Sequence, residues 1–342
     1  MTKSMNYQVR LKAHPTGMPG PETWDFVTEP VADPAEGEFL AKVLYVSLDP
    51  AMRVWINEGD TYVRHVRLGE VMRASVVAEV VFSRNPDYTV GDCVAGRLGV
   101  QRYAISNGTD MIGEPLVRIP KGAGHPSLYL GTLGVPGLTA YFGMLEIGRL
   151  QSGQTVVVSG ATGAVGSVAG QIARIKGCRV IGIAGGPEKC AYLRNELHYD
   201  GAVDHKAGNV SAQLAELCPE GADIFFDNVG GDILDAALLH LALRARVVIC
   251  GSVSQYASSG GVKGPVNYRQ LLIKRARMEG FILYDFADRY EQARTDLARW
   301  HTEGSLIALE DVMKGLDQFP EAMQRMLAGS KIGKLLIEVE DQ

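Results

Sequence analysis

The chain contains 342 residues, 46% of them hydrophobic, and carries a formal net charge of −5 at pH 7. Chains of this length usually fold as two domains, and the composition is typical of globular proteins rather than of disordered or fibrous ones. The mildly acidic charge and the lack of a basic stripe argue against nucleic acid as a partner. Residues 1–10 lack the apolar stretch of a secretory signal, and charged residues interrupt the most apolar window, 233–250. We therefore expect a cytoplasmic protein without a membrane-spanning segment.

The five cysteines are scattered along the chain and include no C-x-x-C pair. An odd number without paired spacing is typical of reduced thiols rather than of a disulfide framework or a zinc cluster. Cys250 ends a predicted strand and precedes a glycine, where a reactive thiol and a small core residue both fit.

The first third of the sequence is typical of β structure. Short β-branched or alternating runs are separated by turn clusters such as Asn85-Pro86-Asp87 and Asn107-Gly108. These runs predict strands at 39–46, 74–81, 92–95 and 101–105.

From about residue 131 the pattern changes to strands that alternate with amphipathic helices, which is typical of parallel βαβ units. Six strands with crossover helices form a complete doubly wound sheet, so the predicted fold class is α/β. The strands are predicted at 155–159, 179–184, 201–204, 224–228, 246–250 and 278–283. The helices are predicted near 164–176, 188–196, 211–217 and 231–241.

The C-terminal region predicts two further helices, at 290–303 and at about 310–328, and a last strand at 334–339. This strand has no partner in the βαβ order. We therefore expect it to return to the β-rich first domain, which makes that domain discontinuous.

The most informative segment runs from Val157 to Gly170, where a β-branched strand meets glycines at 160, 163 and 166 before a helix begins. The pyrophosphate of a dinucleotide needs a strand, a glycine turn and a helix N-terminus in this order. The spacing is G-x-x-G-x-x-G, which by itself also suits an ordinary βα turn. Its position after the first strand of a doubly wound sheet favours a dinucleotide site.

The tip of the second predicted strand distinguishes NAD from NADP. An acidic residue there would accept hydrogen bonds from the ribose 2′-hydroxyl of NAD, but this chain has Gly185 and Gly186, followed by Lys189. A small uncharged tip beside an ammonium group suits a 2′-phosphate, which favours NADP(H) as the cofactor. Lys189 is also compatible with an ordinary solvent-exposed helix lysine.

Several segments together resemble the zinc-independent medium-chain dehydrogenases/reductases. The resemblance is greatest to the NADPH-dependent double-bond reductases of the leukotriene B4 12-hydroxydehydrogenase, prostaglandin reductase and curcumin reductase group. It implies a GroES-like β-rich domain at residues 1–126, completed by 292–342, a Rossmann NADP-binding domain at 127–291, and a homodimer. The matching segments are 47–53, 133–142, 159–174, 184–189, 226–231, 250–256 and 277–281.

The resemblance also implies cofactor contacts, residue by residue. The pyrophosphate would lie on the glycine turn, the 2′-phosphate at the second strand tip, and the nicotinamide beside the later strands. The pyrophosphate residues are Gly163, Ala164, Val165 and Gly166, with Asn228 near the pyrophosphate or the nicotinamide ribose. The remaining residues are Gly186 and Lys189 at the 2′-phosphate, Cys250, Ser252 and Tyr256 beside the cofactor, and the backbone of Phe281 and Leu283 at the nicotinamide amide.

Three positions depart from the family pattern. His205 stands where the family often has a Tyr in a D-Y-K sequence, and a neutral imidazole binds phosphate more weakly than a charged one. Lys331 stands where the family has an Asn in a G-x-N-x-G-K pattern. Ile273 replaces a Tyr that, in plant and animal members, helps to stabilise an enolate through the nicotinamide ribose. That role is therefore taken elsewhere or absent.

A zinc alcohol dehydrogenase needs Cys, His and Glu ligands around one open position. The predicted first domain has Cys93 as its single cysteine, and His65 has no neighbouring ligand in the sequence. We therefore expect no metal.

The chemistry that the resemblance implies without a metal is reduction of the C=C bond of an α,β-unsaturated ketone or aldehyde. Hydride goes to the β-carbon, hydrogen-bond donors stabilise the enolate, and a hydroxyl or water protonates the α-carbon. Tyr62 and Tyr256 are the candidate catalytic donors, and each is alternatively a residue that lines the pocket. Arg53, after the Asp49-Pro50 turn, either binds substrate or pairs with Asp49.

Two other functions stay open at this point. An NADPH quinone reductase would also use the cofactor without a metal. A non-catalytic NADPH-binding protein is the second alternative, and the loss of a hydroxyl at Ile273 is the observation in its favour.

Overall fold

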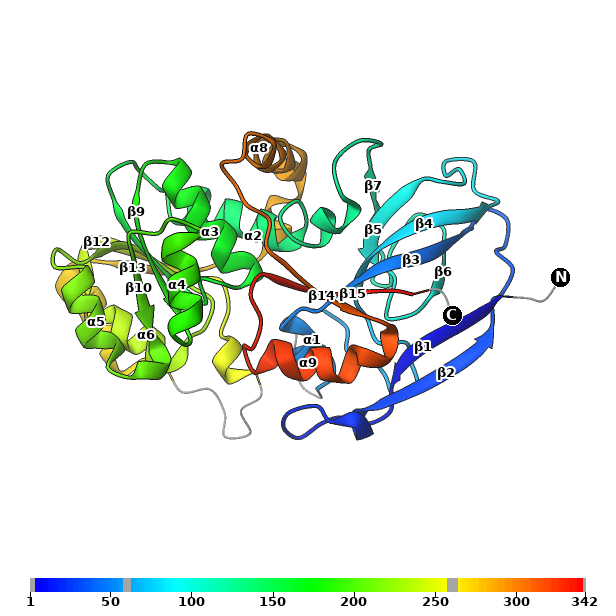
Figure 1. Cartoon of the computed structure of the whole chain (residues 1–342), viewed down its shortest axis with the longest axis horizontal. Helices are drawn as coiled ribbons and strands as arrows, with labels where there is room; N and C mark the ends of the chain where they lie inside the picture. Colours follow the sequence, from blue (N-terminus) through cyan, green and yellow to red (C-terminus); the bar gives the residue numbers. More distant parts are fainter. Residues whose placement is uncertain (1–3, 58–62, 257–263, 341–342) are drawn as a thin grey trace. The chain divides into compact units, whose positions relative to one another are not determined.

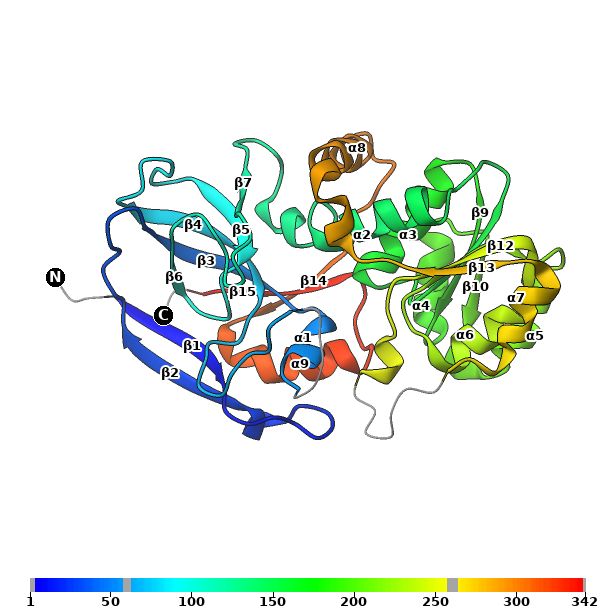
Figure 2. The same cartoon turned by 180° about the vertical axis from the view of Figure 1, so that it is seen from behind.

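A computed structural model describes residues 4–57, 63–256 and 264–340 of the chain. The chain divides into two compact units (Figures 1 and 2). The first unit contains residues 1–130 and 310–342, and the second contains residues 131–309.

The second unit is built on a parallel sheet. Within residues 131–256 and 264–309, six strands pair in the order β10-β9-β8-β11-β12-β13, and every neighbouring pair is parallel. The order reverses between β8 and β11, so the topological switch point lies at the carboxyl ends of these two strands. The strands are β8 Thr155–Ser159, β9 Arg179–Ala184, β10 Gly201–Asp204, β11 Ala222–Asp227, β12 Leu241–Ile249 and β13 Arg277–Gly280.

Helices cover both faces of this sheet, because alternate side chains of each strand point to opposite sides. Ile181 and Ile183 of β9 pack in one core with Leu214 and Leu238 on two of the helices. Gly182, between them, faces Leu193 and Tyr199 on the other side. The helices of this unit are α2 Val135–Phe142, α3 Ala164–Ile175, α4 Pro187–Asn195, α5 Val210–Leu217, α6 Gly231–Leu238, α7 Arg269–Lys274 and α8 Tyr290–Thr302.

These observations confirm the predicted α/β fold with a doubly wound sheet. One predicted strand is too long, because the last strand ends at Gly280 rather than at residue 283. A 3₁₀ helix, Leu283–Arg289, takes over there.

The first unit is β-rich, as predicted. In residues 4–57, 63–130 and 310–340, one sheet has the strand order β14-β15-β3-β4-β5-β7 with β6 also paired to β3, and β1 pairs with β2 separately. The strands are β1 Met5–Leu11, β2 Trp24–Pro30, β3 Phe39–Ser47, β4 Ser75–Ser83, β5 Cys93–Arg97, β6 Tyr103–Ser106, β7 Val117–Ile119, β14 Glu310–Lys314 and β15 Lys334–Glu338. The helices are α1 Ala51–Trp55 and α9 Phe319–Leu327.

The last strand, β15, returns to this unit as predicted and pairs antiparallel with β3. Lys334 at its start is 2% exposed. Its Nζ donates to the Leu48 carbonyl at 2.8 Å and also pairs with the Asp49 carboxylate. These contacts hold the C-terminal strand against the end of β3, because a buried ammonium group is costly without such partners.

The predicted helix at 310–328 is wrong in its first part. Glu310–Lys314 forms β14, which pairs in parallel with β15, and α9 begins at Phe319 after Gly315, whose φ is +86°. The pairing partner lies more than twenty residues further along the chain, so local periodicity does not reveal it.

The return to the first unit occurs at residue 310 rather than at residue 292. Helix α8 lies between these two positions and packs within the second unit. Its Ala293, Leu297 and Trp300 are buried, and Asp296 accepts a hydrogen bond from Tyr141 at 2.8 Å.

Arg53 does not pair with Asp49. Its guanidinium donates to the carbonyls of Pro15 and Gly17, while the Asp49 carboxylate pairs with Lys334.

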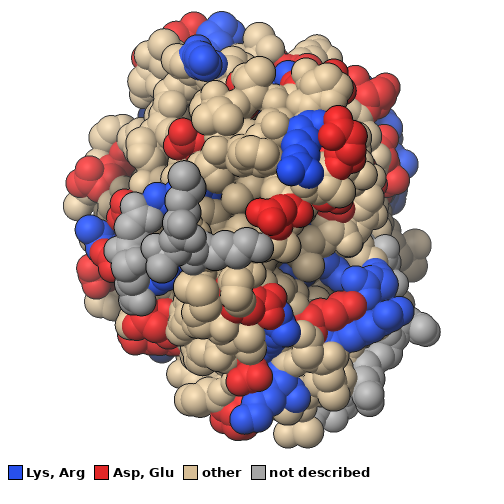
Figure 3. All heavy atoms as spheres, turned by 90° about the vertical axis from the view of Figure 1, so that its right-hand side faces the viewer, with Lys and Arg blue, Asp and Glu red and all other residues tan. Residues whose placement is uncertain are grey.

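On the face that Figure 3 shows, basic and acidic side chains are interspersed rather than gathered into a stripe of one sign. In the described part of the chain, no helix is long and apolar enough to cross a membrane.

Candidate functional site

The carboxyl ends of the parallel strands lie along one edge of the second unit's sheet, where ligands of doubly wound folds bind. Most of the predicted cofactor residues follow these strand ends directly. They are Gly163, Ala164, Val165 and Gly166 after β8, Gly186 and Lys189 after β9, His205 after β10, Asn228 after β11, Cys250, Ser252 and Tyr256 after β12, and Phe281 and Leu283 after β13.

The glycine turn after β8 brings helix α3 unusually close to the strand. Gly160 has φ +58°, a conformation that favours glycine. A Cβ on Gly166 would lie 2.3 Å from the Gly160 carbonyl oxygen, which leaves no room for any side chain. Gly163 donates its N–H to the same carbonyl at 2.9 Å. Gly160 and Gly166 are therefore needed for the turn itself.

Helix α3 begins after Gly163 without a side-chain cap. The amides of Ala164, Val165 and Gly166 consequently have no acceptor within the helix, and together with the helix dipole they favour an anion. The first turn carries no acidic residue. This uncapped turn at the switch point is well suited to a phosphate group.

A buried carboxylate joins the ends of β8 and β11 at the same place. Asp227 is 0% exposed and accepts hydrogen bonds from Ser159 Oγ at 2.7 Å and from the Gly230 amide at 3.1 Å. Burial raises the pKa of the Asp227 carboxyl, and these hydrogen bonds oppose the change. Asn228 donates its amide N–H to Ser159 Oγ and its Nδ2 to the Ser159 carbonyl. The two strand ends at the switch point are thus locked together.

The same network positions the segment after β12. The amides of Cys250 and Gly251 donate to the Asp227 carbonyl at 2.9 and 3.1 Å. The chain then turns back, so that the Ser252 amide donates to Tyr256 Oη at 3.4 Å. Burial raises the pKa of the Tyr256 phenol, so the phenol keeps its proton at neutral pH. Tyr256 thus keeps a phenolic proton at this edge of the sheet, while its oxygen accepts the Ser252 amide.

Two glycines form the tip of β9. Gly186 has φ +96°, precedes α4 without a side-chain cap, and has open space where a Cβ would stand. Its amide donates to Asp204 Oδ1 at 2.7 Å, which ties the tip of β9 to the end of β10. Lys189 lies in the first turns of α4, as the sequence predicts.

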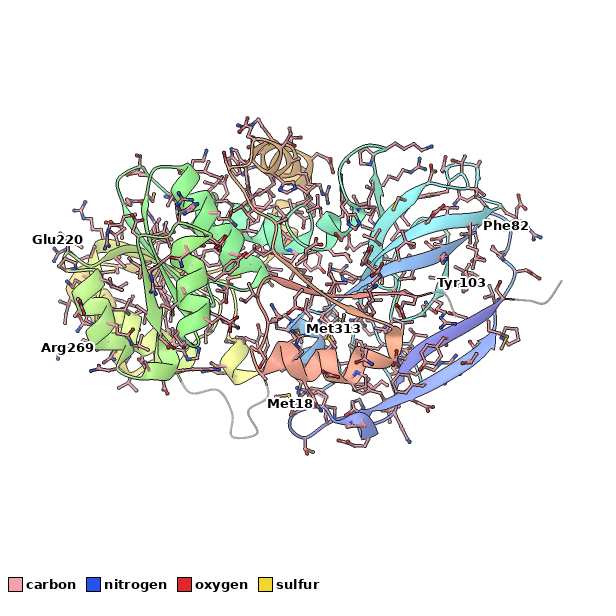
Figure 4. The ribbon with its side chains drawn as sticks, in the orientation of Figure 1. Met18, Phe82, Tyr103, Glu220, Arg269 and Met313 are labelled. Carbon is pink, nitrogen blue, oxygen red and sulfur yellow. The ribbon has the colours of Figure 1, made fainter. Side chains whose placement is uncertain are left out.

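Three further residues stand out in the sequence, Ile273, Lys331 and Tyr62. Ile273 lies on α7 with an exposed side chain, and Figure 4 labels Arg269, the first residue of that helix. Lys331 belongs to the first unit, where its Nζ donates to the Gly333 carbonyl at 2.6 Å. Tyr62 lies outside the described residues.

Sequence reasoning missed Ser159, Asp227, Asp204 and Lys206. The first two form the switch-point network and the last two belong to the β9–β10 tips. Ser159 and Asp204 each end a predicted strand, and Asp227 is the next-to-last residue of one. A polar residue at such a position is a usable signal for a ligand site in a parallel sheet.

No group of three or more His, Cys, Asp and Glu side chains that suits a metal ion occurs in residues 4–57, 63–256 and 264–340. The absence of a metal stays a prediction.

Two family models match the chain. One describes the N-terminal domain of oxidoreductases and covers residues 7–113, and the other describes zinc-binding dehydrogenases and covers residues 164–299. The NADPH-dependent curcumin reductase of Escherichia coli is 40% identical to the chain, and the alignment covers 98% of both proteins. Prostaglandin reductase 1 of Mus musculus is 39% identical to the chain, and the alignment covers 96% of this chain and 97% of that protein.

A solved structure shows the same architecture. The crystal structure of CurA from Vibrio vulnificus in complex with NADPH matches 98% of this chain with a TM-score of 0.92 at 39% identity, and is itself covered completely. The two units described above are thus the GroES-like and Rossmann parts of an oxidoreductase. The chain belongs to the medium-chain dehydrogenase/reductase family, in the branch of curcumin reductase and prostaglandin reductase 1.

Replacing Gly166 by alanine tests the close approach of α3 to β8. The new Cβ would overlap the Gly160 carbonyl, so we expect the free energy of unfolding to fall by about 1–3 kcal/mol, the usual cost of overpacking. Gly163→Ala is the matched control, because its nearest neighbour would lie at 3.1 Å and its φ of −81° suits alanine. Urea denaturation of both variants measures the difference, and an equal loss of stability would contradict the packing argument.

Proposed function

We propose that the protein reduces the C=C bond of α,β-unsaturated ketones or aldehydes with NADPH. The observation that carries the proposal is the uncapped glycine turn of α3 at the switch point, in a chain about 40% identical to reductases named for curcumin and prostaglandins. The CurA structure that the chain resembles was solved with NADPH bound.

The residues at the strand ends fit NADPH. The turn Gly163–Gly166 offers backbone amides to the pyrophosphate and has no side chain that would block its approach. No carboxylate ends β9, and Gly186 leaves open space there beside Lys189. Lys189 would pair with the 2′-phosphate, and Asn228 would lie near the pyrophosphate or the nicotinamide ribose. When bound, the cofactor supplies hydride for the β-carbon of the substrate.

The chain's own contribution to the reaction is positioning and stabilisation of charge. Negative charge develops on the carbonyl oxygen of the substrate as the β-carbon is reduced, and a fixed hydrogen-bond donor lowers the energy of that state. Tyr256 has such a donor, because its oxygen accepts the Ser252 amide and its own proton is left for another acceptor. Since its pKa is raised, the phenol stabilises the enolate by hydrogen bonding more readily than by giving up its proton. Tyr62 stays a second candidate.

An NADPH quinone reductase is the rival function. Its support among solved structures is a quinone oxidoreductase of Pseudomonas syringae pv. Tomato, which shares the fold at 22% identity and a TM-score of 0.76. Because the named reductases are much more similar in sequence, reduction of enones is the function favoured here.

Initial rates of NADPH oxidation separate these functions. We expect kcat/KM for an aryl enone such as benzylideneacetone to exceed that for simple quinones at least tenfold, with the saturated ketone as product. A preference for quinones would favour the rival enzyme. Tight binding of NADPH with no oxidation across a panel of enones and quinones would leave a non-catalytic binding protein.

Replacing Tyr256 by phenylalanine tests the hydrogen-bond donor. We expect kcat for the enone to fall roughly 10- to 100-fold while the Kd for NADPH changes less than threefold, because the ring remains and one donor is lost. Tyr103→Phe, at a tyrosine of β6 in the first unit (Figure 4), is the control and should leave both constants unchanged. An unaltered kcat in Tyr256→Phe would reassign the donor to Tyr62, water or the ribose hydroxyl.

We also propose that the protein is a homodimer formed through β13. This strand is at the end of the sheet order, so one of its edges has no partner in the described chain, and exposed strand edges favour pairing. Apolar side chains on and beside the strand are exposed, Leu272 by 76% and Met278 by 37%. A two-fold axis at Met278 would place Arg277 of one copy opposite Glu279 of the other, which is a self-complementary arrangement.

A single charge tests this assembly. We expect Leu272→Glu to convert the dimer to a monomer in size-exclusion chromatography with light scattering, since burying an unpaired carboxylate is costly. Leu68→Glu is the control, because Leu68 is also strongly exposed, at 56%, but lies in the first unit. A monomeric wild-type protein would overturn the proposal.

A cytoplasmic location remains part of the proposal. All five cysteines lie in the described residues and are free thiols, which suits a reducing compartment.

A further inference from the structure

Three basic side chains gather at the tip of β9. Lys189 lies on α4, and His205 and Lys206 lie in the 3₁₀ turn His205–Ala207 that follows β10. A Cβ on Gly185 would stand 2.7 Å from His205 Nε2 and 3.1 Å from Lys206 Cε. The imidazole and the lysine side chain therefore lie directly over the main chain of the strand tip.

The backbone beneath these side chains is fixed by Asp204. Its Oδ1 accepts the Gly186 amide at 2.7 Å and the Lys206 amide at 2.9 Å, so one carboxylate joins the two strand tips. Gln213 of α5 holds Asp204 in turn, by accepting its amide N–H at 3.0 Å and donating to its carbonyl at 3.1 Å. The position of His205 relative to the tip of β9 is thus set by the fold.

Burial opposes protonation of His205 in the protein alone, and charged groups of both signs lie near the imidazole. Packing against the strand tip is the main cause that lowers the pKa of the imidazole, and Lys206 and Lys189 lower it further. Asp204 acts in the opposite direction, but its carboxylate is already engaged by two backbone amides. His205 is therefore neutral at pH 7, with Asp204 as the anionic group that acts on it most and two lysines as its basic neighbours.

We propose that His205 takes up a proton when NADPH binds, so that discrimination between NADPH and NADH weakens as the pH rises. The inference rests on the proposed 2′-phosphate site at Lys189. A phosphate at this tip supplies the negative charge that offsets the two lysines, and it thereby favours the imidazolium form of His205. NADH has a hydroxyl at the same position and provides no such charge.

The direction of the pH effect follows from this coupling. If NADPH binding raises the pKa of His205, protonated His205 adds to the affinity for NADPH. This added affinity is complete below the pKa that His205 has in the free protein, and it is lost above the pKa that His205 has in the NADPH complex. The 2′-phosphate itself gains a proton near pH 6, so the effect is to be measured above that value. Between pH 6.5 and 8.5 we expect the ratio of Kd for NADH to Kd for NADPH to fall about tenfold.

The test compares variants of the full-length protein by fluorescence titration with NADPH and with NADH at several pH values. His205→Gln keeps a polar side chain that does not titrate, and we expect its Kd ratio to change less than threefold over the same range. His240→Gln is the matched control. His240 directly precedes β12, and its imidazole contacts Ser211 Oγ at 2.7 Å. Burial lowers the pKa of this imidazole as well. This variant should retain the pH dependence of the wild type.

Calorimetry in two buffers of different ionisation enthalpy provides a second readout, because it counts protons taken up on binding. The wild type should take up more protons with NADPH than His205→Gln does near pH 7, and the two should be equal with NADH. Identical pH profiles of wild type and His205→Gln would overturn the proposal.

Lys189→Gln distinguishes failure of this inference from failure of the site. If Lys189→Gln weakens NADPH but not NADH while His205→Gln has the wild-type pH profile, the phosphate site stands and the role of His205 falls. If neither substitution changes the NADPH to NADH preference, the 2′-phosphate lies elsewhere and both proposals are wrong.

Discussion

The second unit depends on the contact between the α-carbon of Gly166 and the carbonyl oxygen of Gly160. Because no side chain intervenes, α3 starts directly behind the end of β8, and its first amides point beyond the strand at the switch point. The buried carboxylate of Asp227 then fixes the neighbouring strand end against Ser159. These two contacts fix the positions of the backbone amides that would bind a phosphate. No flexible side chain therefore has to be ordered when the anion binds.

The carboxylates at the strand ends act as internal supports rather than as ligands. Asp227 and Asp204 each accept backbone amides from a segment that crosses to a neighbouring strand, and in each case the segment beyond carries the proposed ligand contacts. Burial in the core raises the pKa of the Asp227 carboxyl, whereas the backbone hydrogen bonds from Gly186 and Lys206 lower the pKa of the Asp204 carboxyl. Aspartate thus supports the proposed pyrophosphate site from a buried position and the proposed 2′-phosphate site from a less buried one.

The parallel sheet was predictable from the sequence because its strands are buried on both faces and read as short runs such as Val156–Val158. Strand β2, whose exposed residues include Asp25, Phe26 and Thr28, and β7, with three residues, give no comparable pattern. The error at 310–314 has the same origin, since β14 exists through its ladder with β15. Glycine spacing located the turn after β8, but the convergence of His205 on Gly185 joins two loops and is visible in three dimensions alone. Roles that depend on a single side chain, such as those of Tyr256 and Lys331, cannot be derived from spacing.

Burial of the cysteines has a chemical consequence for an enzyme that handles electrophiles. An α,β-unsaturated carbonyl, the substrate proposed here, alkylates thiolates, and Cys250 follows β12 at the edge of the sheet where the cofactor contacts gather. Burial and the nearby Asp227 raise the pKa of this thiol to about 12, so the neutral thiol predominates at pH 7. Burial raises the thiol pKa of the other four cysteines as well. Raised thiol pKa values would slow the alkylation of these cysteines by substrates of the proposed class.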